Sequence, residues 1–228
     1  MREFFGWADC VIVLSEEWLD YFAANVCDST KILVMHNAVA LPEAPINPCA
    51  HQSVLFLGRL GARKSPDVLL RAAKTLRVRF PEARYVFGGD GDVEKYRALA
   101  TALGVADVCN FVGWVTGEDK ERLVRQTGIF CLSSRHEGMP MSLLEMMAYG
   151  LPCVMTPVGG IPQVIHDGEN GFMSPVGDVD DLADRLAELL ASPELRGSIG
   201  TAARRTIERD FNIDANILKL ADLYRELS

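Results

Sequence analysis

Short apolar runs alternate with amphipathic segments along most of this chain. Apolar runs typical of strands buried on both faces lie at residues 8–14, 31–35, 54–57, 84–87, 108–111, 129–132, 153–155 and 161–165. Helices are predicted after Ser15, near Ser65-Pro66, and over residues 93–103, 118–126 and 140–150. Three further helices, at about 179–191, 193–209 and 213–227, form a C-terminal helical tail. This alternation predicts an α/β fold with a parallel sheet and helices on both of its faces.

A proline-rich segment divides the chain near residue 50. Residues 41–48 contain three prolines and indicate a linker. The run at 8–14 is apolar enough to need strands on both of its edges, so we expect an earlier domain to precede it. We therefore predict a domain remnant with its linker at 1–50, the main domain at 51–210, and a final helix at 211–228 that packs back toward the remnant.

Residues 133–150 combine the end of a strand, a tight turn and a helix, and they carry two carboxylates. Pro140 suits the first position of this helix, whose apolar residues cover nearly every direction and predict burial around its single charge, Glu145. Glu145 is expected to lean back toward the turn that carries Glu137. The free N–H groups and the dipole of the helix N-terminus favour an anion there. Two carboxylates beside an anion site suggest a polyol phosphate ligand. On these residues alone it is equally plausible that Glu145 pairs with a basic residue in the core and Glu137 is a solvated loop residue.

Loops that leave the carboxyl ends of parallel strands meet in one crevice, where ligands of such sheets bind. The loops expected there span residues 58–64, 88–92, 112–114, 133–137 and 156–160. Arg59 follows a strand and Lys64 precedes a helix, so both cations could hold one diphosphate; two solvated surface cations are about as plausible from this loop alone.

Composition and other motifs narrow the function. A net charge of −8 argues against a general nucleic-acid binder. The six cysteines form no CxxC pair, which favours buried reduced thiols. No leader or membrane-spanning segment is evident in the sequence, so we expect a cytoplasmic protein that is peripheral at most to the inner membrane face. The turn at 88–92 lacks the GxGxxG spacing of dinucleotide-binding sites, and the sequence contains no P-loop motif. His136 lies beside a turn and is interpreted as a hydrogen-bonded structural residue.

Taken together, these motifs resemble family 4 of the glycosyltransferases, a large retaining class with the GT-B fold. Glu137 and Glu145 with the seven residues between them resemble the E-x7-E signature of that family. Residues 56–64 resemble its phosphate-binding loop, 89–91 its glycine turn and 111–114 its base-side loop, and similar segments follow at 151–171. The resemblance covers about residues 53–210, which would form the Rossmann-like C-terminal donor-binding domain. It departs at Ser65-Pro66, where family members commonly have glycine after the lysine.

The resemblance implies a role for each matching residue. Arg59 and Lys64 would hold the donor diphosphate and, with Glu137, contribute to catalysis. Glu145 would bind the ribose hydroxyls and Glu137 the sugar hydroxyls. The full set implied for donor binding is Gly58, Arg59, Lys64, Gly113, Glu137, Gly138, Met139, Pro140, Met141 and Glu145. No cofactor or metal is implied, and Asp90 and Asp92, although spaced as DxD, fall in the glycine turn and are interpreted as turn formers.

The resemblance implies a hexosyltransferase that moves a sugar from a nucleotide-diphosphate sugar to a glycan or lipid-linked acceptor. The sugar would keep its anomeric configuration, and the reaction would belong to polysaccharide, glycan or glycolipid synthesis. Two alternatives remain open: a nucleotide-sugar epimerase of GT-B shape, and an inactive or split donor-binding module. The second would need a separate N-terminal domain as partner, and self-association through exposed apolar surface is also expected.

Overall fold

The computed structural model describes residues 5–227, and its centre is a six-stranded, all-parallel sheet. The order β5-β4-β3-β6-β7-β8 places the earliest strand of the sheet in its interior. The strands are β3 (Ser53–Leu57), β4 (Arg84–Gly88), β5 (Cys109–Gly113), β6 (Ile129–Leu132), β7 (Cys153–Met155) and β8 (Phe172–Met173). Every residue of β6 and β7 is buried, as expected for strands covered on both faces.

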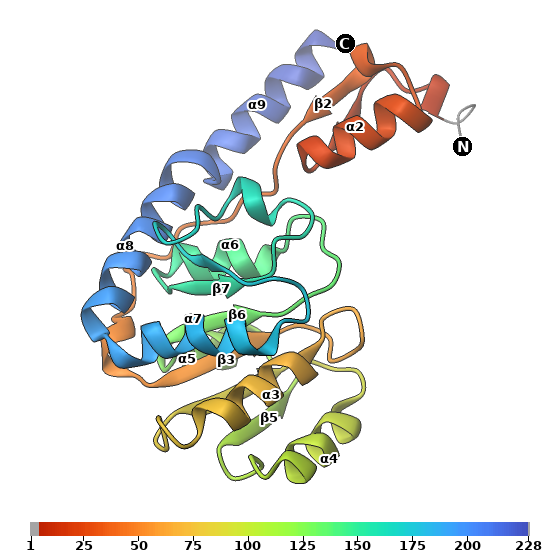
Figure 1. The fold of residues 1–228 in the computed structure, drawn as a ribbon. Helices are drawn as coiled ribbons and strands as arrows, with labels where there is room; N and C mark the ends of the chain where they lie inside the picture. The colour runs from red at the N-terminus through yellow and green to blue at the C-terminus, as the bar shows by residue number, and fades with distance from the viewer. Residues whose placement is uncertain (1–4, 228) are drawn as a thin grey trace.

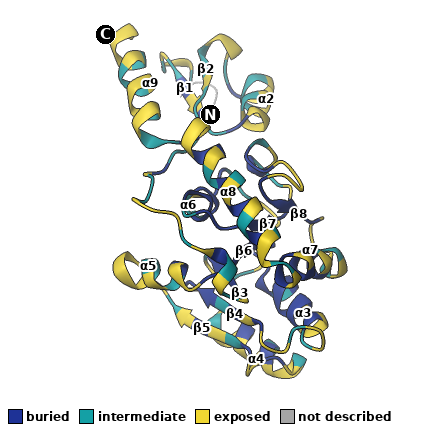
Figure 2. Ribbon diagram, turned by 90° about the vertical axis from the view of Figure 1, so that its left-hand side faces the viewer, coloured by how far each residue is buried: buried dark blue, intermediate teal, exposed yellow. Residues whose placement is uncertain are grey.

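Helices cover both faces of this sheet, which confirms the predicted fold class. Helix α3 (Pro66–Leu76) contacts α4 (Val93–Leu103) and α7 (Val179–Ala191) on one face. Figure 2 shows α5 (Gly117–Arg125) and α6 (Met141–Ala148) on the other side of the sheet. Helix α8 (Pro193–Asp210) packs against both α6 and α7, so it closes one side of the domain.

One predicted strand is wrong. Residues 161–165 are not a strand, because Ile161–Gln163 form a short 3₁₀ helix, η3. Pro162 has no N–H to donate to a sheet, which disfavours a strand at this position. The sixth strand is instead β8, the apolar pair Phe172–Met173 that follows a tight loop.

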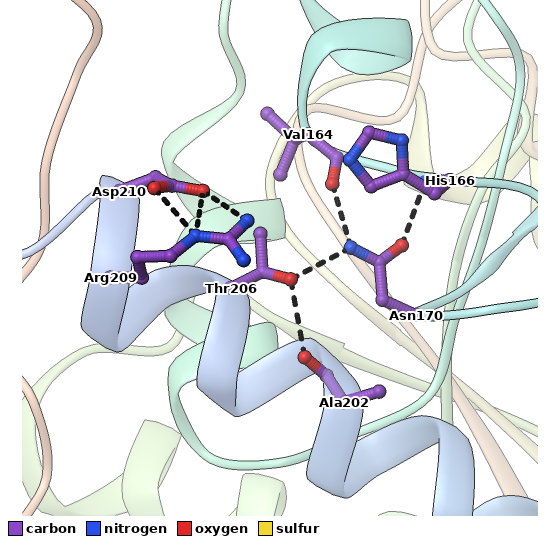
Figure 3. Close-up of polar contacts among 7 residues, drawn as sticks. All are labelled: Val164, His166, Asn170, Ala202, Thr206, Arg209 and Asp210. Atoms are coloured by element: carbon purple, nitrogen blue, oxygen red, sulfur yellow. Dashed lines mark hydrogen bonds and ion pairs between the residues drawn. The ribbon is translucent and has the colours of Figure 1, made fainter.

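Asn170 fixes that loop to α8 (Figure 3). The buried Asn170 amide donates from Nδ2 to the Val164 carbonyl and to Thr206 Oγ1, each at 2.9 Å, and its Oδ1 accepts from the His166 N–H at 2.7 Å. Thr206 Oγ1 in turn donates to the Ala202 carbonyl one helical turn earlier. The asparagine of the 167–171 motif is therefore a structural residue that holds the approach to β8.

Residues 5–50 include a smaller unit beside the C-terminal helix. Strands β1 (Val11–Val13) and β2 (Ile32–Val34) make a parallel pair with α2 (Glu16–Asn25), and Figure 1 shows α9 (Ile213–Glu226) running next to them. Ser15 caps α2 as predicted, accepting from the Trp18 N–H. Two short 3₁₀ turns, η1 (Ser29–Lys31) and η2 (Pro48–Ala50), complete the segment.

Two chain segments join this unit to the main sheet, and they run side by side. Val39 bridges to Asn212, donating to the Phe211 carbonyl at 2.9 Å and accepting from the Ile213 N–H at 3.1 Å. Asn216 on α9 donates to the His36 carbonyl at 2.7 Å. Across residues 5–227, no helix has the length and apolar character needed to cross a membrane.

Candidate functional site

A cavity of about 400 Å³ opens at the carboxyl ends of the central strands, the edge at which the sequence predicts a ligand. Loops after β3, β4 and β5 supply one part of its wall, and the first turn of α6 supplies the opposite part. The lining residues are Leu57, Gly58, Lys64, Gly88, Gly89, Trp114, Val115, Thr116, Gly117, Lys120, Pro140, Met141, Ser142 and Glu145. Three of the five loops expected to converge therefore line this cavity, and the 133–137 and 156–160 loops do not.

Lys64 and Glu137 form an ion pair at the edge of this cavity. Lys64 Nζ lies 2.6 Å from Glu137 Oε1, and the two side chains are only 11% and 5% exposed. Ser134 Oγ donates to the same carboxylate oxygen at 2.6 Å. Glu137 is therefore not a solvated loop residue, and the charge of Lys64 at the cavity wall is already matched by a carboxylate.

Glu145 is paired as well, but in a more open setting. Its Oε2 lies 2.6 Å from Nζ of Lys120 on α5, and the two side chains are 32% and 29% exposed. Glu145 is the single charge of α6 as predicted, but its expected burial is wrong, because the cavity leaves one side of α6 open to solvent. The alternative that Glu145 pairs with a basic residue is what the structure has, although Lys120 is partly exposed and does not lie in the core. The sequence interpretation missed Lys120, whose available signal is its position in the first turn of the helix that follows a strand-exit loop.

Arg59 does not line the cavity in this structure. Its guanidinium is largely exposed, and Nη1 pairs with Asp90 Oδ2 at 3.2 Å across the tips of two neighbouring loops. The predicted convergence of Arg59 and Lys64 on one point is absent from the described conformation of residues 5–227, because Asp90 holds the arginine. Asp90 thus links the β3 and β4 loops.

The N-terminus of α6 faces the cavity. Pro140 is the residue just before the first helical position, not the first helical residue as predicted, and Met141 and Ser142 begin the helix. A helix leaves its first N–H groups without intrahelical acceptors, so this end of α6 offers donors and a positive dipole end to an anion.

Backbone contacts fix the walls of the site. A Cβ at Gly89 would lie 2.0 Å from the Gly58 carbonyl oxygen, and a Cβ at Gly159 would lie 2.1 Å from that of Glu137. Both glycines also have positive φ values, of 146° and 58°. Only glycine allows these loops to approach so closely, so the β3 loop at Gly58 and the turn at Glu137 each pack against a neighbouring loop.

Three of the remaining predicted residues lie outside the cavity lining and contact neighbouring loops through hydrogen bonds to their backbone carbonyls. The Gly113 carbonyl accepts from the Gly89 N–H, and the Gly138 carbonyl accepts from the Gly160 N–H, both at 2.7 Å. Met139 is buried, and its carbonyl accepts from Asn37 Nδ2 at 2.9 Å. Gly113, Gly138 and Met139 do not line the cavity, whereas Gly58, Pro140 and Met141 do.

Ser65 occupies a backbone conformation that is rare for a residue with a side chain. Its φ and ψ of 46° and 53° lie in the left-handed region, directly after Lys64 and before Pro66. Ser65 Oγ donates to the Ala62 carbonyl at 2.9 Å and accepts from Arg135 Nε at 3.1 Å. These bonds explain how serine is accommodated where the resembling family has glycine.

Burial determines the state of several cysteine thiols. All six cysteines are free; Cys131 and Cys153 are buried, and the other four are partly buried. Burial raises the pKa of the Cys131 and Cys153 thiols, and it raises that of Cys109 to about 12. Among residues 5–227, no three His, Cys, Asp or Glu side chains are placed to share a metal ion.

Comparison with known proteins matches this chain to glycosyltransferases. The model of the family described as glycosyl transferases group 1 matches residues 50–206. EpsD of Bacillus subtilis, named as a glycosyltransferase, is 31% identical over 96% of this chain and 61% of its own length. A D-inositol 3-phosphate glycosyltransferase of Saccharomonospora viridis is 35% identical over 75% of this chain and 42% of its own.

Solved structures agree on the fold. A sucrose-phosphate synthase from Thermosynechococcus elongatus superposes with a TM-score of 0.87 at 25% identity, over 99% of this chain and 60% of the other. Anabaena HepE, solved in complex with UDP, has a TM-score of 0.85 at 18% identity, over 96% of this chain and 64% of HepE. The chain spans about three fifths of the length of EpsD and of these two structures.

Proposed function

Because this chain belongs to the glycosyl transferases group 1 family, we propose that it is the donor-binding half of a retaining glycosyltransferase of family 4 that uses a nucleotide-diphosphate sugar. The observation that carries this proposal is the cavity between the β3 loop and the N-terminus of α6, with Lys64 and Glu145 in its wall. The structure of HepE with UDP supports a nucleotide ligand in a fold of this kind.

The cavity wall suggests where each part of a donor would lie. The diphosphate would bind between Lys64 and the first turn of α6, where both the ammonium and the helix N-terminus favour anions. Glu145 would accept hydrogen bonds from the ribose hydroxyls. Trp114, 70% exposed on the β5 loop, offers an aromatic face on the base side.

Cleavage of a sugar–phosphate bond places growing negative charge on the leaving diphosphate. Lys64 and the α6 dipole would stabilise this charge more in the transition state than in the ground state. Glu137 holds Lys64 in place and would also contact the sugar hydroxyls. Arg59 would add a second cation if its guanidinium moves from Asp90 toward the diphosphate. The proposal requires no divalent metal ion.

Acceptor binding and turnover require more than this cavity. The chain spans 61% of the length of EpsD, so we propose that a further domain, in the same or another polypeptide, forms the acceptor side of the cleft. Glycan or lipid-linked acceptors remain the expected class.

Calorimetry with UDP, GDP and ADP tests the proposal. We expect Lys64→Met to weaken binding of the preferred nucleotide by about 1.5–3 kcal/mol, the range for a hydrogen bond to a charged group. Lys74→Met, on the exposed side of α3, is the matched control and should leave the affinity unchanged. Equal affinity of the Lys64→Met variant and the unaltered chain would remove the phosphate role of Lys64.

Metal independence has its own test. Binding of the preferred nucleotide should be the same in the presence of EDTA and of MgCl₂. A large loss of affinity in EDTA would contradict the metal-free proposal and would direct attention to Asp90 and Asp92.

A further inference from the structure

The ion pair between Lys120 and Glu145 stands between two hollows in the protein surface. One is the cavity described above, and the other, of about 520 Å³, lies between residues 38–42, α5 and α6. Four residues line both hollows: Gly117, Lys120, Met141 and Glu145. A carboxylate with open space on both sides has rotamers that point away from the first cavity, so something must hold it there.

Lys120 contacts one oxygen of this carboxylate and leaves the other available. Nζ lies 2.6 Å from Oε2, and within residues 5–227 no hydrogen-bond donor reaches Oε1. An ionised carboxylate accepts several hydrogen bonds, so Oε1 keeps its full capacity for hydroxyl groups of a ligand.

The charges of the cavity also depend on Lys120. Its lining contains two cations, Lys64 and Lys120, and one carboxylate, Glu145. Lys64 is already matched by Glu137, so without Lys120 the carboxylate of Glu145 would stand unbalanced where we place an anionic ligand. Like charges in a partly desolvated site repel each other more strongly than in bulk water.

We infer that Lys120 is a positioning and specificity-determining residue of the donor site. By binding Oε2, it directs Glu145 toward the ribose hydroxyls and cancels the repulsion between that carboxylate and the diphosphate. The inference rests on the proposed function, and it assigns to α5 a role that the E-x7-E segment and the phosphate loop do not include.

A double-mutant cycle on UDP binding tests the inference, with GDP or ADP used instead if either binds more tightly. Lys120→Met should weaken binding about ten-fold, which corresponds to about 1.4 kcal/mol. In a Glu145→Gln background the same change should cost at most about two-fold, because a neutral amide needs no neighbouring cation. Lys120→Arg should restore most of the lost affinity, since a guanidinium can also pair with Glu145.

Ribose selectivity is the readout that a merely structural role would not change. The unaltered chain should bind UDP more tightly than 2′-deoxy-UDP, and Lys120→Met should shrink that ratio toward one. Arg122→Met is the matched control, because Arg122 lies on the same helix and pairs with Asp119 outside the cavity. Thermal unfolding followed by circular dichroism should show the Lys120 and Arg122 variants equally folded.

The outcomes separate the two hypotheses. If the unaltered chain binds none of the nucleotides, the proposed function fails and the inference fails with it. If it binds a nucleotide but the Lys120 and Glu145 losses are additive, or the deoxy ratio is unchanged, the inference alone is overturned. Coupled losses with reduced ribose selectivity support it.

Discussion

Ser65 shows how one residue can depart from the pattern of a family without changing its backbone. The left-handed conformation of a residue with a Cβ costs roughly 1–2 kcal/mol, and glycine avoids that cost. Here two side-chain hydrogen bonds, to Ala62 and from Arg135, offset part of it. The backbone after Lys64 therefore follows the path expected for glycine.

Substitution at this position separates strain from hydrogen bonding. We expect Ser65→Ala to lower the free energy of unfolding by about 1–2 kcal/mol, because it loses two hydrogen bonds and keeps the strain. Ser65→Gly loses the same bonds but relieves the strain, so it should lie within about 1 kcal/mol of the unaltered chain. Urea unfolding followed by tryptophan fluorescence measures both, and a glycine variant less stable than the alanine variant would contradict the explanation.

The sequence predicted several charged residues of the site but not the ion pairs that they form. The strand-exit loops and the family resemblance together predicted that Lys64, Glu137 and Glu145 belong to one crevice. Lys64 and Glu145 line the cavity, and Glu137 pairs with Lys64 at its edge. The loops and the resemblance did not predict Lys120 as partner of Glu145, or Asp90 as partner of Arg59. Those pairs join segments that meet only through the folded loops, and no local pattern encodes them.

At the scale of elements, one buried cation connects three of them. Arg196 on α8 is 1% exposed, and no carboxylate within the described part of the chain pairs with it. Instead its guanidinium donates to the carbonyls of Pro48, Leu189, Leu190 and Cys49. Arginine thereby caps the C-terminal end of α7 and anchors η2 to the α7–α8 corner.

Loss of this guanidinium should destabilise the main domain. We expect Arg196→Met to lower the free energy of unfolding by about 3 kcal/mol or more, because several charge-assisted bonds are lost and buried carbonyls stay unpaired. Arg209→Met on the same helix, which breaks only an exposed pair with Asp210, should cost less than about 1 kcal/mol. Chemical denaturation of the two variants makes the comparison, and equal losses would disprove the anchoring role.

Strands were predictable where burial on both faces requires a continuous apolar run, and less so at the edge of the sheet. Strands β3 to β7 lie within or next to the predicted apolar runs. The agreement is closest for β6 and β7, whose residues are all buried and therefore all apolar. Strand β8 has only two residues, too few for any period, and it depends on Asn170 and α8 for its position. The apolar run before it contains Pro162, whose effect on strand formation outweighs its neighbours' hydrophobicity.

At the scale of the whole molecule, the apolar surface is uneven. Large exposed apolar side chains gather in the small unit and α9, although Val78 and Trp114 of the main domain are also exposed. Figure 2 shows α2 and α9 coloured mainly as exposed or intermediate, whereas β6 and β7 are buried. Neither α2 nor α9 has a fully buried residue. The most exposed apolar side chains here are Trp7, Tyr21, Ile217, Leu218 and Tyr224. Exposed apolar side chains that form a patch mark contact sites for other proteins or domains.

We expect the isolated chain to self-associate through this end. Sedimentation equilibrium should show an average mass that rises with protein concentration, and Leu218→Glu should weaken the association about ten-fold or more, because it places a charge in the apolar contact. Val78→Glu, at a still more exposed site after α3, is the control and should have no effect. A single monomeric mass at all concentrations, or equal effects of the two variants, would count against this surface.

Positions in and around the cavity differ in how freely their amino acids can be changed. Gly89 and Gly159 meet backbone oxygens of Gly58 and Glu137, so any side chain there would push whole loops apart. Gly89 lines the cavity and Gly159 lies outside it, whereas Trp114, Thr116 and Ser142 line the cavity without that constraint. A combinatorial library aimed at a new nucleotide preference should therefore keep the glycines fixed and randomise those three positions, where sequence change leaves the loop framework intact.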